Sequence, residues 1–151
     1  GQLIQTFQLL DGMCNAIASG FTYGQREDPG VQRPSETIER RAGSCRDYST
    51  LFIEGCRFLG LAARFVSGYL HSPTTRLGDG STHAWVEVYL PGAGWKGFDT
   101  TSGRITGSDH IAVAVTRHPA DAPPISGSFL GPSGCTSTMN VVVDVTEEPA
   151  N

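Results

Sequence analysis

The order of elements along the sequence predicts an α+β domain, with helices in the first part of the chain and antiparallel strands in the second. Two observations carry this prediction. Before residue 60, apolar residues recur at three- and four-residue steps, the period of an amphipathic helix. After residue 60, the chain consists of short segments rich in β-branched and aromatic residues, bounded by turn-forming residues, which is typical of strands.

The helical part is expected to hold three helices. The first has a stripe of apolar side chains that Gly20 can end, and the third begins at a cysteine and stops at Gly60. A stretch rich in glycine, proline and charge over residues 21–34 is expected to be a loop. The third helix should be buried as the centre of the domain. The predicted helices are residues 3–18, residues 35–41 with Ser35 as candidate cap, and residues 45–59.

The strand part is expected to hold five strands. Residues 118–134 contain four prolines and three glycines and are expected to form a surface loop, because an apolar strand still follows them. No internal repeat is visible. The predicted strands are residues 62–70, 82–90, 95–100, 111–116 and 139–145.

Size and charge limit the classes of function. With 151 residues, we expect a single domain over residues 1–151, as a piece of a longer chain. No apolar run reaches the roughly 18 residues of a membrane span, so we expect no membrane partner. A net charge of −4, with only one pair of adjacent cations, argues against a nucleic-acid partner. The oligomeric state is left open.

The cysteines argue against a metal site and against disulfides. Their spacing fits no zinc motif, so we expect neither a metal nor a cofactor. Cys45 and Cys56 share one predicted helix and lie roughly 16 Å apart, beyond the reach of a disulfide. A reducing compartment, the cytoplasm, is therefore expected, with a periplasmic enzyme that keeps free thiols as the alternative.

Cys45 is the candidate nucleophile, because it lies at the start of a helix. The positive end of the helix dipole and the unpaired N–H groups of the first turn favour a thiolate there. The same N–H groups, including that of Cys45, can stabilise an oxyanion that develops on a carbonyl under attack. The start of this helix is therefore expected to supply both the nucleophile and donors to the oxyanion.

His83 is the candidate base, because it begins a segment with strict alternation. Positions 84, 86, 88 and 90 are apolar and should face the core. The other face then carries an unusual set of side chains for plain solvent exposure, and one suited to the floor of a cleft: His83, Trp85, Glu87 and Tyr89.

The hairpin after this strand decides whether Asp99 can orient His83. A loop of three residues from Leu90, or of five residues ending at Ala93, pairs His83 directly with Asp99 on one face. A four-residue loop would move Asp99 to the other face. We adopt the odd-length loop, because it gives Asp99 the task of fixing the imidazole tautomer. Two further pairs follow from this register: Trp85 with Gly97 and Glu87 with Trp95.

Four segments of the chain follow one another in a characteristic order and spacing: residues 43–47, 59–69, 82–89 and 94–101. In this order and spacing they resemble the core of bacterial transglutaminase-like proteins. The resemblance implies a papain-like fold, in which the helix bearing the cysteine packs on an antiparallel sheet. It also implies a triad of Cys45, His83 and Asp99 that attacks amide carbonyls through a thioester, with water or an amine as acceptor. The chain departs from the family pattern at Thr100 and at residues 116–119, which bears on substrate choice.

Other residues have competing interpretations. Tyr23 either donates its hydroxyl to the oxyanion or packs as a loop aromatic, and Trp85 either lines the substrate cleft or fills space. Asp47 is expected to cap the helix rather than to act as a second acid. The remaining histidines (His71, His110, His118) are expected in loops without a role, and the remaining cysteines in the core (Cys14, Cys56) or in an exposed loop (Cys135).

The resulting hypothesis is a thiol enzyme that acts on a peptide or protein substrate, with peptidase action as the leading outcome. Bulk water is the default acceptor, and nothing in the sequence shows an amine site. Two alternatives stay open. One is a protein-glutamine transglutaminase or amidase, and the other is a silent peptide-binding scaffold domain with the same fold.

Overall fold

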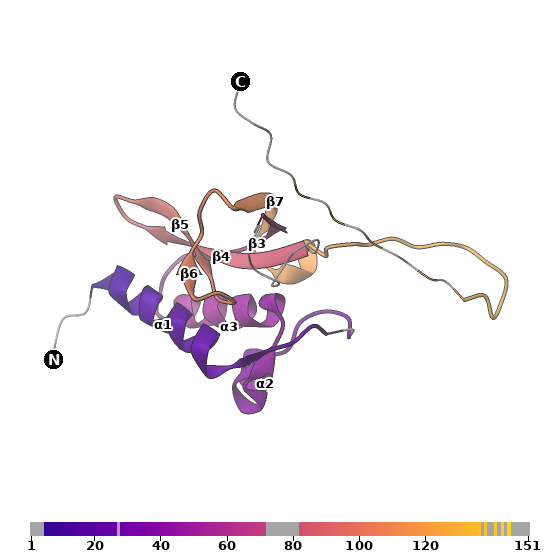
Figure 1. The fold of residues 1–151 in the computed structure, drawn as a ribbon, viewed down its shortest axis with the longest axis horizontal. Coiled ribbons are helices and arrows are strands. Elements are labelled where there is room, and N and C mark those ends of the chain that lie inside the picture. The colour runs from indigo at the N-terminus through magenta and orange to yellow at the C-terminus, as the bar shows by residue number, and fades with distance from the viewer. Residues whose placement is uncertain are drawn as a thin grey trace, which may run out of the picture.

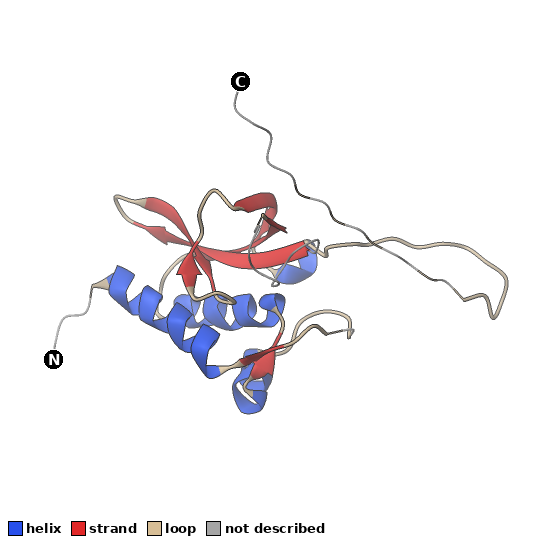
Figure 2. Ribbon diagram, viewed as in Figure 1, coloured by secondary structure: helices blue, strands red, loops and turns tan. Residues whose placement is uncertain are grey.

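The structure is a computed structural model that describes residues 5–26, 28–71 and 82–136, together with residues 138, 141, 143 and 145. It has two layers, with helices beneath a curved antiparallel sheet (Figure 1, Figure 2). The α+β prediction is confirmed. Within the described residues, no helix has the length and apolar character needed to cross a membrane.

The three helices are α1 (Thr6–Gly20), α2 (Pro34–Arg40) and α3 (Cys45–Phe58). The proposed cap at Ser35 is wrong: Arg33 is the residue that precedes α2, and Ser35 lies inside the helix. The physical reason is Pro34, whose fixed φ and missing N–H suit the first helical position. The end of α3 agrees with the prediction, since Gly60 follows it at a φ of 78°.

Helix α3 is the buried centre of the fold, as predicted. It packs on strands β3 and β4 and also contacts α1 and α2. One side of the helix supplies fully buried side chains to the core: Tyr48, Phe52, Ile53 and Cys56. Because this helix is held on several sides, the position of its first residue, Cys45, is fixed by the packing of the whole core.

The sheet has five strands in the order β6-β5-β4-β3-β7. All its pairings are antiparallel. The predicted strand over residues 139–145 falls largely outside the described residues. The short β6 had no signal in the sequence analysis. The strands are β3 (Ala63–Leu70), β4 (Thr82–Leu90), β5 (Gly94–Asp99), β6 (Arg104–Ile105) and β7 (His110–Thr116).

A second, two-stranded sheet corrects the expectation of a plain loop over residues 21–34. Strand β1 (Thr22–Tyr23) pairs in parallel with β2 (Ala42–Gly43), directly before α3. The pairing brings Tyr23 next to the start of the central helix. A two-residue strand leaves no periodic pattern, so only its partner from a distant segment reveals it.

The hairpin between β4 and β5 has an odd-length loop, as predicted, but its position differs. Leu90 pairs with Gly94, so the loop is residues 91–93, one residue later than the three-residue loop we expected. Gly92 and Gly94 adopt φ values of 82° and 73°, which L-residues rarely reach and which place the turn here. The predicted pairing of His83 with Asp99 is therefore wrong, as are the two further predicted pairs. The observed partners are Val86 with Phe98, Glu87 with Gly97, and Tyr89 with Trp95.

The faces of β4 are nevertheless as predicted, because an odd-length loop preserves them. Ala84, Val86 and Val88 are almost fully buried in the core cluster under the sheet. His83 and Trp85 lie on the opposite face and are also buried. The sheet curls over this face, since the first residue of β7 meets the last residue of β5 although two strands lie between them.

Candidate functional site

Cys45 lies at the N-terminus of α3, at the edge of a cleft of about 600 Å³. Only 8% of the residue is exposed, so the thiol opens to the cleft and otherwise packs against the core. The cleft is bounded by the loop around residues 25–30 on one side and by the segment around residues 120–125 on the other. Residues that line it next to the thiol are Tyr23, Ser44, Arg46 and Thr82.

The entry into α3 is held by the buried carboxylate of Asp47. It accepts a hydrogen bond from the Ser44 backbone N–H at 2.8 Å, which is one half of a capping box, and a separate one from the Ser44 hydroxyl at 2.9 Å. It also accepts from the Gln32 N–H at 2.7 Å and the Arg26 guanidinium at 2.9 Å. The interpretation of Asp47 as a capping residue is confirmed. Its contacts go further and tie the cleft loop to the helix that carries Cys45.

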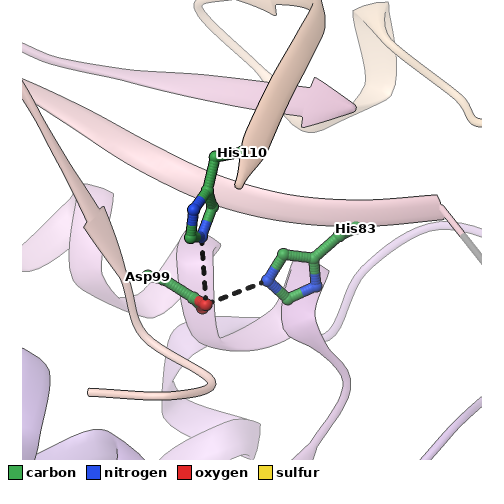
Figure 3. A group of neighbouring side chains, drawn as sticks. All are labelled: His83, Asp99 and His110. Carbon is green, nitrogen blue, oxygen red and sulfur yellow. Dashed lines mark hydrogen bonds and ion pairs between the residues drawn. The ribbon is translucent and has the colours of Figure 1, made fainter. Parts of the chain in front are cut away.

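His83, from β4, and Asp99, at the end of β5, point toward each other (Figure 3). His83 Nε2 lies 3.2 Å from Asp99 Oδ2, and the side chains are 5% and 1% exposed. The contact does not have the geometry of a well-aligned hydrogen bond, and it is described as an ion pair. The register places Asp99 diagonally across from His83, a distance that these side chains still span.

The environment favours a charged His83. Burial alone would lower the pKa of His83, but contacts with Asp99 and Cys45, and attraction to both, raise it from 6.5 to about 10. Burial would raise the pKa of Asp99, but contacts with His110, His83 and Ser102 hold it far below its usual range. His83 is therefore held as an imidazolium, with the Asp99 carboxylate and the sulfur of Cys45 as its neighbours.

Asp99 is fixed from behind by the turn that follows it. Its Oδ1 accepts from the Thr101 N–H at 2.9 Å, with the Ser102 N–H at 3.4 Å, and its Oδ2 accepts from the Ser102 hydroxyl at 2.7 Å. This turn leaves Oδ2 directed toward the histidines. The carboxylate can thus orient His83 without rotating.

We expect the pH dependence of stability to report His83. A pKa raised on folding means that its contribution is complete below about 6.5 and disappears as the pH rises through about 10. Asp99 has the opposite sign, because its pKa is lowered, so its contribution disappears as the pH falls below its ordinary value of 3.8. Urea unfolding of the wild type and of His83→Gln between about pH 6 and pH 10 isolates the histidine. The same alkaline loss in both proteins would contradict the assignment.

His110 lies at the first position of β7, and its side chain is 4% exposed. The expectation that it sits in a loop without a role is corrected: its Nε2 is 3.4 Å from Asp99 Oδ2. Sequence reasoning missed it because curling of the sheet brings the two strands together. The one available signal in the sequence was that His110 directly precedes a segment of β-branched residues. His83 stands at a similar position, near the start of its own strand. His71 and His118 do lie outside strands.

Tyr23 and Trp85 occupy different environments. Tyr23 lines the cleft. Burial, electrostatic repulsion by Cys45 and a hydrogen bond to Cys45 raise the pKa of Tyr23 to about 12, so its hydroxyl keeps the proton. Trp85 is 2% exposed, packs edge-on against His110 with ring centroids 5.2 Å apart, and does not line the cleft. A Cβ on Gly68 would lie 2.7 Å from the Trp85 ring, so only glycine leaves room for this packing.

Arg46 has a role that the sequence left undecided. Its guanidinium donates to the carbonyls of Pro119 at 2.6 Å and Ala122 at 3.0 Å, and it lies over the Phe65 ring at 4.9 Å. The residue after the candidate nucleophile thus anchors one wall of the cleft. No local pattern shows this contact, because its partners are more than 70 residues away in the sequence.

The other thiols are not part of the site. Cys14 and Cys56 are buried in the core, and burial raises the pKa of each to about 12. Cys135 is exposed. All four cysteines, each among the described residues, are free thiols, as predicted.

One donor set among the described residues has the composition of a metal site. His83, Asp99 and His110 offer two imidazole nitrogens and one carboxylate oxygen, all within 4.8 Å of one another. Each of the two contacts to the carboxylate also has the length of a weak hydrogen bond or ion pair. Hydrogen bonds and ion pairs can therefore hold these three side chains together without a metal ion.

Known proteins with similar sequences include uncharacterised proteins of mycobacteria. A Mycobacterium tuberculosis protein is 31% identical over 147 residues, which is 91% of this chain and 45% of the relative. A Mycobacterium leprae protein is 30% identical over 115 residues, or 74% of this chain and 40% of the relative. The chain thus spans less than half the length of these relatives.

Solved structures share the fold. A candidate cysteine protease from Cytophaga hutchinsonii has a TM-score of 0.67 and 29% identity, over 81% of this chain and 40% of that chain. The periplasmic domain of TgpA from Pseudomonas aeruginosa has a TM-score of 0.52 and 24% identity, over 66% of this chain and 39% of that chain. The family model of the transglutaminase-like superfamily matches residues 5–100, which include Cys45, His83 and Asp99. This chain belongs to the transglutaminase-like superfamily, with its papain-like core.

Proposed function

We propose that this chain is a thiol enzyme that transfers acyl groups from peptide or glutamine-type amides through a thioester on Cys45. Hydrolysis is the principal outcome, which makes it a cysteine peptidase. The observation that carries the proposal is the placement of His83 between a thiol at a helix N-terminus and the buried carboxylate of Asp99. The family membership and the similar candidate cysteine protease support it.

The chemistry follows from the positions of three side chains. The Cys45 thiolate attacks the amide carbon, and the carbonyl π electrons move to the oxygen. As the oxyanion collapses, the C–N bond breaks, and His83 gives its proton to the leaving amine. Neutral His83 then takes a proton from water, whose oxygen attacks the thioester. The C–S bond breaks and releases a carboxylic acid and the Cys45 thiolate, beside the protonated His83 with which the cycle began. Asp99 holds the ring in the orientation that both proton transfers need.

Two groups are available for the oxyanion. The backbone N–H of Cys45 belongs to the first turn of α3, where the helix supplies no acceptor for it. The Tyr23 hydroxyl reaches the thiol from strand β1 and retains its proton. Donors on a helix end and on a paired strand are fixed before the reaction, which is what makes such donors effective.

The lining of the cleft favours an extended, uncharged segment of peptide. Its cations are already paired, since Arg26 contacts Asp47 at 2.9 Å and Asp28 at 3.5 Å, while Arg46 is held by backbone carbonyls. Little positive charge is left for a phosphate-rich partner, so we propose a peptide or protein substrate and no nucleic acid. Two segments that contain proline and glycine line the walls of the cleft, Pro29–Gly30 and Pro123–Ile125, and a peptide chain fits between them.

The first test uses the exposed Cys135 as an internal reference for Cys45. We expect iodoacetamide at about pH 6 to label Cys45 at least about 10-fold faster than Cys135, because His83 stabilises the thiolate. His83→Ala should remove this difference, whereas His118→Ala, a change at an exposed histidine, should not. Peptide mass analysis locates the label. Equal rates in the wild type would favour the silent scaffold.

Product analysis separates the remaining alternatives. A peptide library is incubated with the wild type in ¹⁸O-labelled water, with and without a fluorescent primary amine, and Cys45→Ala serves as the blank. Peptidase action gives cleaved peptides with ¹⁸O in the new carboxylate, and a transglutaminase gives amine-labelled glutamine. Hydrolysis that persists in Cys45→Ala would contradict the proposed function.

A further inference from the structure

His110 lies against the candidate triad without a place in the mechanism above. Its ring packs beside Trp85 and His83, with centroid distances of 5.2 Å and 6.1 Å. His110 and His83 approach the same oxygen of Asp99 from different directions (Figure 3). A buried imidazole in contact with this carboxylate affects its charge and its orientation.

Each ring nitrogen of His110 faces a carboxylate. Nδ1 is 2.7 Å from Asp109 Oδ1, and Nε2 is 3.4 Å from Asp99 Oδ2. A neutral imidazole carries one N–H and would direct a lone pair at one of these carboxylates, whereas the ring with two protons donates to both. The Gly107 N–H donates to Nδ1 at 3.4 Å, which requires a lone pair on that nitrogen. Both the doubly protonated ring and the neutral ring with its proton on Nε2 donate to Asp99, so this contact does not depend on the charge of His110.

The charged groups around His110 come from several elements. Asp99 faces it from β5, Asp109 precedes it in the chain, and His83 faces it from β4. Arg104, from β6, acts on Asp109 and helps to lower the pKa of that carboxyl, after the contact with His110 itself. Two carboxylates contact the ring directly, while His83 contacts Asp99 rather than the ring nitrogens of His110.

The contact with His110 favours the charged form of Asp99. Burial would raise the pKa of Asp99, and the contact with His110 is the largest of the effects that lower it. An ionised Asp99 is what His83 requires of its partner. The exposed fraction of the Asp109 side chain is 38%, so the outer end of the arrangement reaches solvent.

We propose that His110 is a positioning residue, which holds the Asp99 carboxylate directed at His83, while Asp109 holds His110 in turn. The inference rests on the proposed function, because it extends the Cys45 triad. The contacts then form a chain of five side chains, from the surface to the cleft: Asp109, His110, Asp99, His83 and Cys45. No atom of His110 touches the substrate, and its protons stay in place through the reaction.

¹⁵N NMR of the histidine rings in the whole chain identifies the nitrogen of His110 that carries the proton. We expect Nε2 to be protonated at about pH 7, so that it donates to Asp99, and Asp109→Asn to change the ring ¹⁵N shifts of His110. The same substitution at the exposed Asp121 is the control and should leave His110 unchanged. A ring with its proton on Nδ1 alone would overturn the inference, because Nε2 could then not donate to Asp99. So would one equivalent of bound transition metal that His110→Gln removes, because the three donors would then be metal ligands.

Kinetics on a substrate found with the peptide library test the positioning. We expect kcat to fall about 10-fold in His110→Gln, which keeps a donor, and about 100-fold in His110→Leu, with KM within about 2-fold. His118→Gln should match the wild type. Unchanged kcat in both folded His110 variants would overturn the inference and leave the proposed function intact. If the wild type hydrolyses nothing through Cys45, the proposed function fails, and the ring spectra still decide whether His110 holds Asp99.

Discussion

Asp99→Asn is expected to lower kcat for amide hydrolysis by about 10⁴-fold, by analogy with removal of the orienting carboxylate in a serine protease triad. The Asn Oδ1 can keep the bonds from the Thr101 and Ser102 N–H groups, because both go to Oδ1 of Asp99. The Asn NH₂ then takes the place of Oδ2 and donates where the carboxylate accepted. His83 must present a bare Nε2 to it, which places the ring proton on Nδ1 and leaves no lone pair there to accept the thiol proton.

The effect of Asp99→Asn is measured as kcat and as the pH profile of Cys45 labelling. Glu39→Gln, which also converts a carboxylate to an amide but on an exposed side chain of α2 away from the cleft, is the control and should change kcat by less than about 2-fold. Circular dichroism establishes that the variant is folded. A kcat within about 10-fold of the wild type would show that Asp99 does not orient the base.

Asp47→Ala is expected to lower the free energy of unfolding by about 2–4 kcal/mol, because the Arg26 guanidinium loses its buried partner and keeps only the exposed Asp28 at 3.5 Å. The N–H groups of Ser44 and Gln32 also lose their acceptor. Both lie next to the cleft, so the start of α3 loses its support together with the cleft loop. The reactivity of Cys45 should fall with it.

The stability change is measured by urea unfolding, with Glu54→Ala on the same helix as control. Glu54 is half-exposed and pairs with Arg57 at 2.8 Å, so its removal should lower the unfolding free energy by only about 0–1 kcal/mol. Comparable losses in both variants would mean that the network of Asp47 contributes no more than a surface pair. In that case, packing of α3 alone would hold the cysteine in place.

The secondary structure could be predicted largely from the sequence, because its causes are local. The apolar stripe of α3 and the alternation in β4 are determined by the period of each element, and they placed Cys45 at a helix start and His83 on the face away from the core. The odd loop length gave Asp99 its face. The errors in the predicted elements have local causes as well. Pro34 begins α2, one residue before Ser35, and Gly92 and Gly94 move the hairpin turn by one residue.

The surroundings of these residues were decided by tertiary structure alone. Curling of the sheet brings His110 to Asp99 across two intervening strands, and the pairing of β1 with β2 brings Tyr23 to the thiol. Arg46 finds its carbonyl partners more than 70 residues away. The sequence by itself thus determined the elements, the face that each side chain occupies and the family resemblance. Which side chains meet depended on how the sheet bends and how α3 packs against it, because contacts between distant segments follow from packing of the whole core and leave no periodic trace in the chain.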